Sequence, residues 1–180
     1  MRALPLLLLA LLLAPPALAQ HHPGHGAPPP AAGTPYAGLE SRSIKALSAE
    51  QQADLAAGRG MGLALAAELN GYPGPAHVLE LAAALALRPD QHATAERLRD
   101  AMTATARPLG EQVIAAERQL DTLFANGQAD PTRLAALTQE IGALQGRLRA
   151  VHLAAHIGMR AALSAEQLAA YARLRGYTRQ

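Results

Sequence analysis

The sequence predicts an all-α protein whose centre is a long antiparallel helical hairpin with shorter flanking helices. Leu and Ala dominate the 180 residues, aromatic residues make up 3%, and Trp and Cys are absent, a composition that favours helices. Between residues 130 and 163, apolar residues recur three and four positions apart, which is typical of a helix packed along its length against another helix. This seam consists of Leu134, Leu137, Ile141, Leu144, Leu148, Val151 and Ala155.

Two long helices form the arms of the predicted hairpin. The first runs from residue 88 to about Ala125, and Pro108 inside it predicts a kink, because proline removes one backbone hydrogen bond and clashes one turn back. The second starts at Asp130, a good helix cap followed by proline. The short connection through residues 126–127 makes the two helices antiparallel neighbours. The apolar face expected for the first helix is Leu98, Met102, Leu109, Val113, Leu120 and Leu123.

Shorter helices are expected on both sides of the hairpin, giving a helical domain over residues 47–176. Gly58, Gly60 and Gly62 lie in the first of them and leave a smooth surface that another helix can approach closely. Prolines bracket a glycine just after this unit and break the helix. The expected segments are a helical unit over 47–70, a break at 72–75, a short helix at about 76–87, a last helix over 164–176 and a frayed end at 177–180.

The first 19 residues predict a secretory signal peptide. Arg2 precedes a short apolar run, a Pro-Pro break and a small-residue site, so cleavage is expected after Ala19 and the mature protein in the periplasm. The alternative is a retained anchor, but the apolar run is too short to span a bilayer, and no later stretch is long enough. Residues 20–46 are expected to form a disordered arm and linker rich in His, Pro and Gly, since they lack a periodic apolar pattern.

The charge distribution excludes some functions. Basic and acidic residues nearly balance, so nucleic-acid binding has no support. Residues 133–180 nevertheless hold seven basic and two acidic side chains, which can hold the two halves of the chain together, steer a dimer, present a cationic face to acidic or unfolded partners, or simply remain solvated. No nucleophile or metalloprotease motif is present, so the chain is predicted to be no enzyme. The expected client-binding residues are Arg147, Arg149, Arg160, Arg173 and Arg175.

The strongest chemical pattern is His152, His156 and Met159, which lie on one face of the second long helix. Two imidazoles and a thioether suit a transition metal, and the alternative is that these side chains only pack beside the seam. The first helical unit, over residues 47–70, has no second H-x-x-x-H pair, and Glu68 is one of few candidate donors in it. His77 and His92 come close only if the shorter helices fold back.

A second metal site is expected in the N-terminal arm, which carries His21, His22 and His25. Cleavage after Ala19 leaves His22 as the third residue of the mature chain. An amine, two amides and that imidazole form a square-planar set suited to Cu(II) or Ni(II). The alternatives are a soluble His-rich spacer and an amine blocked by cyclisation of Gln20.

A five-residue phrase, Leu-x-x-x-Gln, occurs at three expected helix starts: 47–51, 87–91 and 163–167. Its last two copies, with Leu87, Gln91, Leu163 and Gln167, resemble the LTxxQ motif of the Spy/CpxP family and of the related periplasmic heavy-metal-resistance and sensor proteins of the CnrX type. Arg88 and Ser164 stand where the motif has Thr. The resemblance implies a hooked hairpin that dimerises into a cradle.

The resemblance also implies one of two roles. The preferred one is an ATP-independent chaperone or envelope-stress adaptor that binds unfolded or envelope proteins and requires no cofactor. The alternative is a heavy-metal sensor or resistance protein that binds Ni, Co, Cu or Zn and acts on a membrane signalling partner. In either role a homodimer is expected, because one hairpin leaves the seam of the second long helix incompletely covered.

Overall fold

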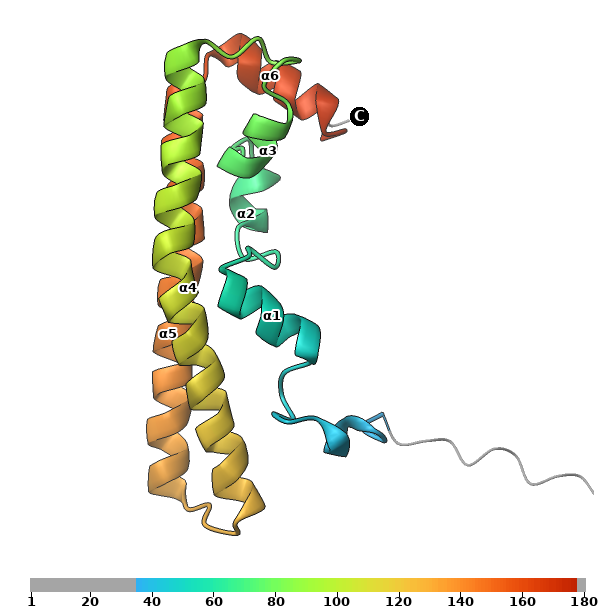
Figure 1. Ribbon diagram of the computed structural model, residues 1–180, viewed down its shortest axis with the longest axis vertical. Helices are drawn as coiled ribbons and strands as arrows, with labels where there is room; N and C mark the ends of the chain where they lie inside the picture. The colour runs from blue at the N-terminus through green and yellow to red at the C-terminus, as the bar shows by residue number, and fades with distance from the viewer. Residues whose placement is uncertain (1–34, 178–180) are drawn as a thin grey trace, which may run out of the picture. The chain divides into compact units, whose positions relative to one another are not determined.

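A computed structural model of the protein describes residues 35–177, which contain helices and no strand. The predictions for residues 1–34 and 178–180, including the signal peptide, His21 and His22, lie outside the described residues. The all-α prediction is confirmed: α4 and α5 form a long antiparallel hairpin, with shorter helices beside it (Figure 1). The elements are a 3-10 helix at Leu39–Ser41 and the α-helices α1 (Ala49–Ala57), α2 (Leu65–Glu68), α3 (Pro75–Glu80), α4 (Pro89–Ala125), α5 (Pro131–Ala162) and α6 (Ala165–Leu174).

The hairpin begins and ends where the local signals predict. The side chain of Asp130 accepts hydrogen bonds from the amides of Thr132 and Arg133, which caps α5. α4 continues through Pro108 as one helix, and its ribbon changes direction partway along its length (Figure 1). Proline therefore bends the arm without dividing it.

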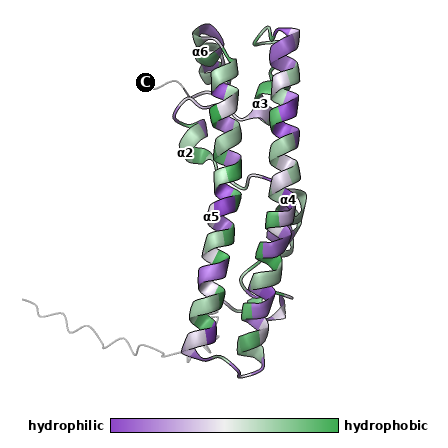
Figure 2. Cartoon of the chain, turned by 90° about the vertical axis from the view of Figure 1, so that its left-hand side faces the viewer, coloured by the Kyte–Doolittle hydropathy of each residue, from purple (hydrophilic) through white to green (hydrophobic). Residues whose placement is uncertain are grey.

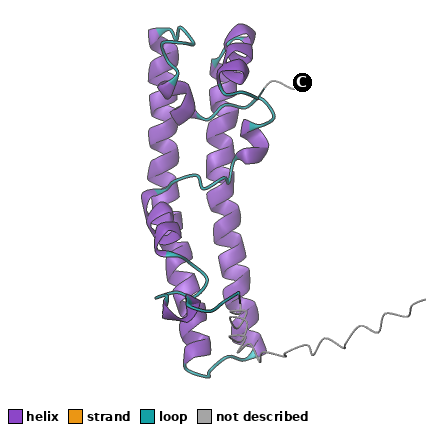
Figure 3. Ribbon diagram, turned by 90° about the vertical axis from the view of Figure 1, so that its right-hand side faces the viewer, coloured by secondary structure: helices purple, strands orange, loops and turns teal. Residues whose placement is uncertain are grey.

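The shorter helices lie along one side of the hairpin, so that α1 packs on α4, α2 on α5, and α3 on both arms (Figure 3). α1 approaches α4 most closely at Gly110, where an added Cβ would overlap the carbonyl oxygen of Leu55. The glycine that allows this close approach is therefore Gly110 of the long helix α4, and not one of the predicted glycines before α2. At the open end, where α4 begins and α5 ends, α6 turns away from α5 (Figure 1).

The expectation of one helical unit over residues 47–70 is wrong. α1 ends at Gly58, whose φ of 69° is left-handed, and only the four residues of α2 are helical again before the break. Met61 and Gly62 also have positive φ. Three glycines within five residues therefore end the helix, because each lowers helix stability relative to alanine. Likewise α3 ends at Glu80, and turns carry the chain on to α4.

Two apolar clusters hold the hairpin together. The loop-side core lies between α1, α4 and the first half of α5. The open-end core lies between α3, the start of α4, the end of α5, and α6. The loop-side core comprises Leu55, Ala106, Leu109, Val113, Ala116, Ile141, Leu144 and Leu148, and the open-end core Val78, Leu85, Ala95, Met159, Leu163 and Tyr171.

Packing within one chain covers most of the seam on α5. Ile141, Leu144 and Leu148 are buried, whereas Leu134 near the hairpin loop is 37% exposed. The side of the hairpin turned away from the shorter helices mixes hydrophobic and hydrophilic residues (Figure 2). The homodimer therefore stays a prediction, and the uncovered part of the seam is shorter than the sequence suggested.

Packing also extends upstream of residue 47. Ile44 is fully buried, and Lys45 forms an ion pair of 3.3 Å with Asp121 of α4. No helix between residues 35 and 177 is long and apolar enough to cross a membrane.

Candidate metal-binding site

The site is built on α5, where His152 and His156 lie one helical turn apart. Only 2% of His152 and 8% of His156 is exposed, so both rings face the interior of the molecule. They follow Leu148 of the loop-side core and precede Met159 of the open-end core. The histidine pair thus occupies the boundary between the two cores.

A cavity of about 300 Å³ lies between these histidines and the loops around α2 and α3. Glycines at positions 60, 62 and 74 form part of its wall, so the backbone approaches the rings closely. An added Cβ at Gly74, for example, would lie 3.1 Å from Nε2 of His156. The lining side chains with donor atoms for a metal are Met61, Glu68, His77, Met102, His152 and His156.

His152 carries an unpartnered ring nitrogen, and its other nitrogen, Nδ1, is the one nearer to Gly60 in the cavity wall. Its Nε2 is buried and has no hydrogen-bond partner among the described residues. Burial lowers the pKa of His152 below its ordinary value, and the neighbouring His156 lowers that pKa further. The ring is therefore neutral near pH 7. A buried imidazole nitrogen without a partner is unusual in a packed core, and a bound ion is one of the arrangements that would satisfy it.

His156 has one nitrogen engaged and one directed at the cavity wall. Its Nδ1 lies 2.7 Å from the carbonyl oxygen of Tyr72 and 3.6 Å from Oε2 of Glu68. Both partners are acceptors, so Nδ1 carries a proton, and in the neutral ring Nε2 holds the lone pair. His156 therefore presents its unprotonated nitrogen beside Gly74, which lines the cavity.

Glu68, in α2, is the charged centre of the site and is only 5% exposed. Its Oε2 accepts from the Gly74 amide at 2.9 Å, and its Oε1 accepts from the Tyr171 hydroxyl and lies 3.2 Å from Nδ1 of His77. Burial alone would raise the pKa of this carboxyl. The hydrogen bonds from Tyr171 and Gly74 and the nearby histidines outweigh burial and hold that pKa below its ordinary value.

The hydroxyl of Tyr171 shows the other side of the same contact. Burial, followed by its hydrogen bond to the Glu68 carboxylate, raises the pKa of Tyr171. The phenol therefore stays protonated and donates. Tyr177 donates a further hydrogen bond of 3.3 Å to Glu68. The carboxylate thus ties α2 to the C-terminal region as well as to the histidines.

The structure brings some of the predicted ligands together and separates others. His152 and His156 share the cavity, and the segment around α3 folds back far enough for His77 to reach it. His92 lies elsewhere, on the exposed start of α4, where it is 3.5 Å from Glu96. Met159 is fully buried in the open-end core and does not line the cavity.

Two methionines outside the predicted ligand set, Met61 and Met102, line the cavity. Met102 was expected only as part of the apolar face of α4. The one sequence signal for this region is Glu68, a lone charged residue in an Ala- and Leu-rich stretch. A buried carboxylate needs partners, so its isolation indicated that polar side chains from elsewhere must meet it.

The donor atoms do not form a finished metal cage. Within residues 35–177, no group of three or more His, Asp or Glu side chains is arranged to hold a metal ion as it stands. Glu68 is occupied by Tyr171, Gly74 and His77. A metal at His152 and His156 would therefore recruit further ligands by side-chain rotation.

The two motif glutamines bond to each other at the open end. Nε2 of Gln91 lies 2.8 Å from Oε1 of Gln167, and Nε2 of Gln167 lies 3.0 Å from Oε1 of Gln91. Each oxygen also accepts from the amide at its own helix start, and each nitrogen donates to a backbone carbonyl, that of Ala162 or Leu85. The repeated phrase thus joins the starts of α4 and α6. Leu87 and Leu163 pack in the adjoining open-end core.

The five arginines proposed as client contacts divide into two groups. Arg147, Arg149 and Arg173 are exposed and form no ion pair within residues 35–177. Arg160 instead donates to the carbonyl of Gly71, and Arg175 lies 3.9 Å from Glu68. The second group belongs to the surroundings of the candidate site.

Fold and site together define a helical hairpin protein with a buried histidine pair beside a cavity. A family model described as "Heavy-metal resistance" matches residues 55–170, and the chain belongs to that family. The match covers α4, α5 and all the donor side chains around the cavity. Searches of curated proteins and of solved structures find no match.

Proposed function

We propose that the protein binds a divalent transition-metal ion in the cavity beside His152 and His156 and serves heavy-metal resistance as a sensor or buffer. The observation that carries the proposal is the buried, unpartnered Nε2 of His152, one helical turn from a histidine with its own Nε2 free. Membership of the heavy-metal resistance family supports the same reading. The metal is the ligand of the protein, and no catalytic step is proposed.

The ligand set follows from the lining side chains. The two Nε2 atoms of His152 and His156 would bind first, because neither needs to give up a hydrogen bond within the described structure. His77 or Glu68 would complete the site by leaving their mutual contact of 3.2 Å. Imidazole with carboxylate suits Ni(II), Co(II), Cu(II) or Zn(II), and a thioether from Met102 would favour the softer ions.

Calorimetric titration with each of these four ions tests the proposal. We expect the mature protein to bind at least one ion with a Kd below about 10 μM, corresponding to roughly 7 kcal/mol. His152→Ala/His156→Ala should abolish this binding. His92→Ala is the matched control, because His92 is an exposed histidine outside the cavity, and it should bind like the unchanged protein.

A protein lacking residues 20–35 separates the cavity from the N-terminal arm with its His21 and His22. If binding disappears with the arm and survives the double substitution, the metal site belongs to the arm and the proposal for the cavity fails. Absence of binding in every form would remove metal binding altogether.

The proposal includes export to the periplasm and the finer kinship with Spy/CpxP-type proteins. A signal peptide over residues 1–19 and the paired Leu-x-x-x-Gln phrases support these two points. Sequencing the N-terminus of the exported protein should give Gln20 or its cyclised form. Light scattering should give a dimer, and a monomer at high concentration would remove the dimer from the proposal.

Metal binding takes the place of the chaperone-type role that the sequence favoured, because the family match gives that role no support. The one observation in its favour is the exposure of Arg147, Arg149 and Arg173 on the basic half of the chain. An aggregation assay with an unfolding client compares the roles directly: a chaperone would suppress aggregation without ATP, and added salt would weaken the effect.

A further inference from the structure

Arg160 lies one helical turn beyond His156 on α5, and both side chains hold the same loop. His156 donates from Nδ1 to the carbonyl of Tyr72, at 2.7 Å, while the guanidinium of Arg160 donates to the carbonyl of Gly71. Two residues spaced i and i+4 therefore bind two consecutive peptide carbonyls of the loop between α2 and α3.

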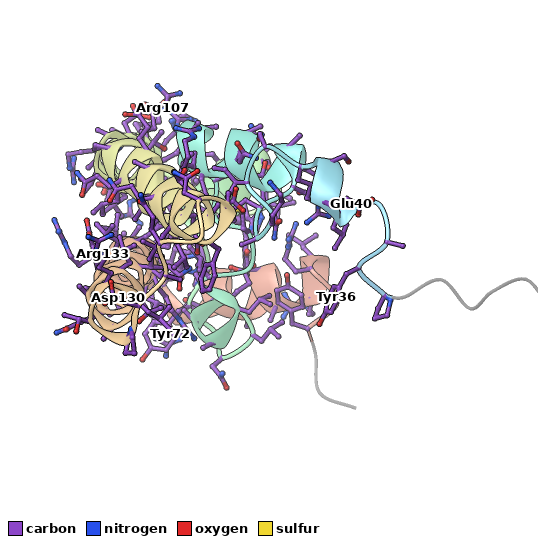
Figure 4. The ribbon with its side chains drawn as sticks, turned by 90° about the horizontal axis from the view of Figure 1, so that it is seen from below. Tyr36, Glu40, Tyr72, Arg107, Asp130 and Arg133 are labelled. Carbon is purple, nitrogen blue, oxygen red and sulfur yellow. The ribbon has the colours of Figure 1, made fainter. Side chains whose placement is uncertain are left out.

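A second contact fixes the guanidinium over this loop. The Cζ atom of Arg160 lies 4.6 Å from the centroid of the Tyr72 ring, within the range of a cation–π interaction. Figure 4 shows Tyr72 beside α5. Arg160 thus contacts the loop at two places, the carbonyl of Gly71 and the ring of Tyr72. Together these contacts restrict the peptide group that joins the two residues.

The loop has limited means of its own to hold that carbonyl in place. Gly71 has a φ of 80°, a left-handed conformation that suits glycine, and its amide makes a long hydrogen bond of 3.4 Å. The amide of Tyr72 is anchored at 3.0 Å from the carbonyl of Ala67, and the amide of Gly74 at 2.9 Å from Oε2 of Glu68. Between these two amides, the carbonyls of Gly71 and Tyr72 accept hydrogen bonds from Arg160 and His156 of α5.

That carbonyl decides which nitrogen of His156 is free. A carbonyl oxygen accepts only, so its contact with Nδ1 places the proton there and leaves Nε2 unprotonated beside Gly74. Oε2 of Glu68, at 3.6 Å, is the other acceptor facing Nδ1, so loss of the Tyr72 carbonyl would leave Nδ1 with this longer contact alone. A proton that then moved to Nε2 would compete with a metal ion there. Partners of this kind, one step removed from the metal, commonly change metal affinity 10- to 100-fold.

We infer that Arg160 is a positioning residue for metal binding: by holding the Gly71–Tyr72 loop it keeps His156 protonated on Nδ1 and its Nε2 free for the metal. This inference rests on the proposed function for its consequence, the metal affinity. Its immediate effect, the proton position on His156, exists in the metal-free protein and can be measured without any metal.

Nuclear magnetic resonance of histidine ring nitrogens gives the first readout. At a pH above the ordinary histidine value of about 6.5, the metal-free protein should show His156 protonated on Nδ1. His156→Gln identifies the signal by its loss. Arg160→Ala should move a substantial share of the protons to Nε2, and Arg160→Lys, which keeps a cation and a donor, should restore part of the Nδ1 form.

The second readout is the Kd for Ni(II) in calorimetry. Arg160→Ala should weaken binding about tenfold, and Arg160→Lys should weaken it less. Arg118→Ala is the control, because Arg118 is an exposed arginine of α4 outside the cavity and should change neither readout. Tyr72→Phe keeps both the ring and the carbonyl, so it should also leave the proton on Nδ1.

The two readouts separate the possible failures. If His156 stays protonated on Nδ1 in Arg160→Ala, the inference is overturned, whatever happens to the melting temperature or the affinity. If the proton moves but the unchanged protein does not bind Ni(II), the positioning of His156 by Arg160 stands and the proposed nickel binding fails. A proton shift with an unchanged Kd would also overturn the link between Arg160 and the metal.

Discussion

The half of the hairpin near its loop and the half near its open end bury different side chains. The loop-side core consists of apolar residues only, packed between α1, α4 and α5. All four polar or charged residues buried within the described part of the chain, Glu68, Gln91, His152 and His156, lie from the middle of the hairpin towards the open end. Buried polar groups are costly unless partnered, so this half of the hairpin needs specific hydrogen bonds between distant segments, and it is the half that contains the candidate site.

One pair of helices therefore combines two kinds of packing along its length. In the loop-side half, close contact of apolar surfaces provides stability. In the other half, an apolar core is joined by buried hydrogen bonds, and these also orient the candidate ligands. The following substitutions test whether the two halves differ in this way, beginning with the largest expected effect.

Gly110→Ala should destabilise the loop-side half most. The added methyl group would overlap the carbonyl oxygen of Leu55. Because this oxygen belongs to the backbone of α1, the whole helix would have to shift away from α4 to relieve the overlap. We expect a loss of about 3 kcal/mol in the free energy of unfolding, measured by urea denaturation. Gly142→Ala is the control: no atom lies within 4 Å of its added Cβ, so it should stabilise α5 by up to ~1 kcal/mol. Equal effects from both changes would contradict the close packing of α1 on α4.

Glu68→Gln should destabilise the open-end half by about 2 kcal/mol at neutral pH, since it removes the charge from several buried hydrogen bonds. The folded-state pKa of Glu68 lies below its ordinary value of 4.5, so the carboxylate contributes its stability above pH 4.5. This contribution is lost as the pH falls through the folded-state pKa. The difference between the two proteins in urea should therefore close below pH 4.5, and a difference that persists there would contradict the role of the charge.

Gln91→Ala compared with Gln51→Ala tests the same phrase in the two halves. Gln91 is buried and bonded to Gln167, so its removal leaves partners unsatisfied and should cost about 1.5 kcal/mol. Gln51 only accepts from the amide of Ser48 at the exposed start of α1, and its removal should cost about 0.5 kcal/mol. Thermal melting of both variants measures the difference, and similar losses would show that capping alone accounts for both.

The pH dependence of His152 should give the smallest effect, because a single side chain titrates. Its folded-state pKa lies below 6.5, so below pH 6.5 the unfolded chain binds a proton that the folded one does not. Stability of the unchanged protein should therefore fall between pH 6.5 and the folded-state pKa, more than that of His152→Gln. Urea midpoints across this range measure the effect, and parallel pH profiles would place the His152 ring in a solvated environment.

Much of the fold could be predicted because its signals are local. The cap at Asp130, the prolines at positions 89 and 131 and the apolar period of both arms all act within one or two helical turns. The segment before α4 was harder. Glycines at 58, 60 and 62 allowed either a close helix contact or the end of a helix, and only the left-handed φ of Gly58 and Gly62 decides it.

For the candidate site, the sequence was sufficient to predict that two histidines lie on the same face of α5. Spacing along a helix fixes that His152 and His156 share a face, whatever the helix packs against. Met159 follows the same spacing, yet the structure places it in the open-end core, because the neighbouring α3 and α6 cover that turn. The face of a helix on which a residue lies follows from local spacing. Whether that face contacts solvent, a cavity or a core depends on the other segments.

The side chains around His152 and His156 come from distant segments, so the packing of the whole chain determines them. Glu68 is separated from His156 by more of the chain than any local pattern spans, and it lies between His156 and His77 because the segment with α2 and α3 folds along α5. The contact of Arg160 with Gly71 arises in the same way. The sequence thus determined the helices, their order and the residues that share each face. Contacts between distant segments follow from the packing of the whole chain, which alone sets the partners of each buried polar atom.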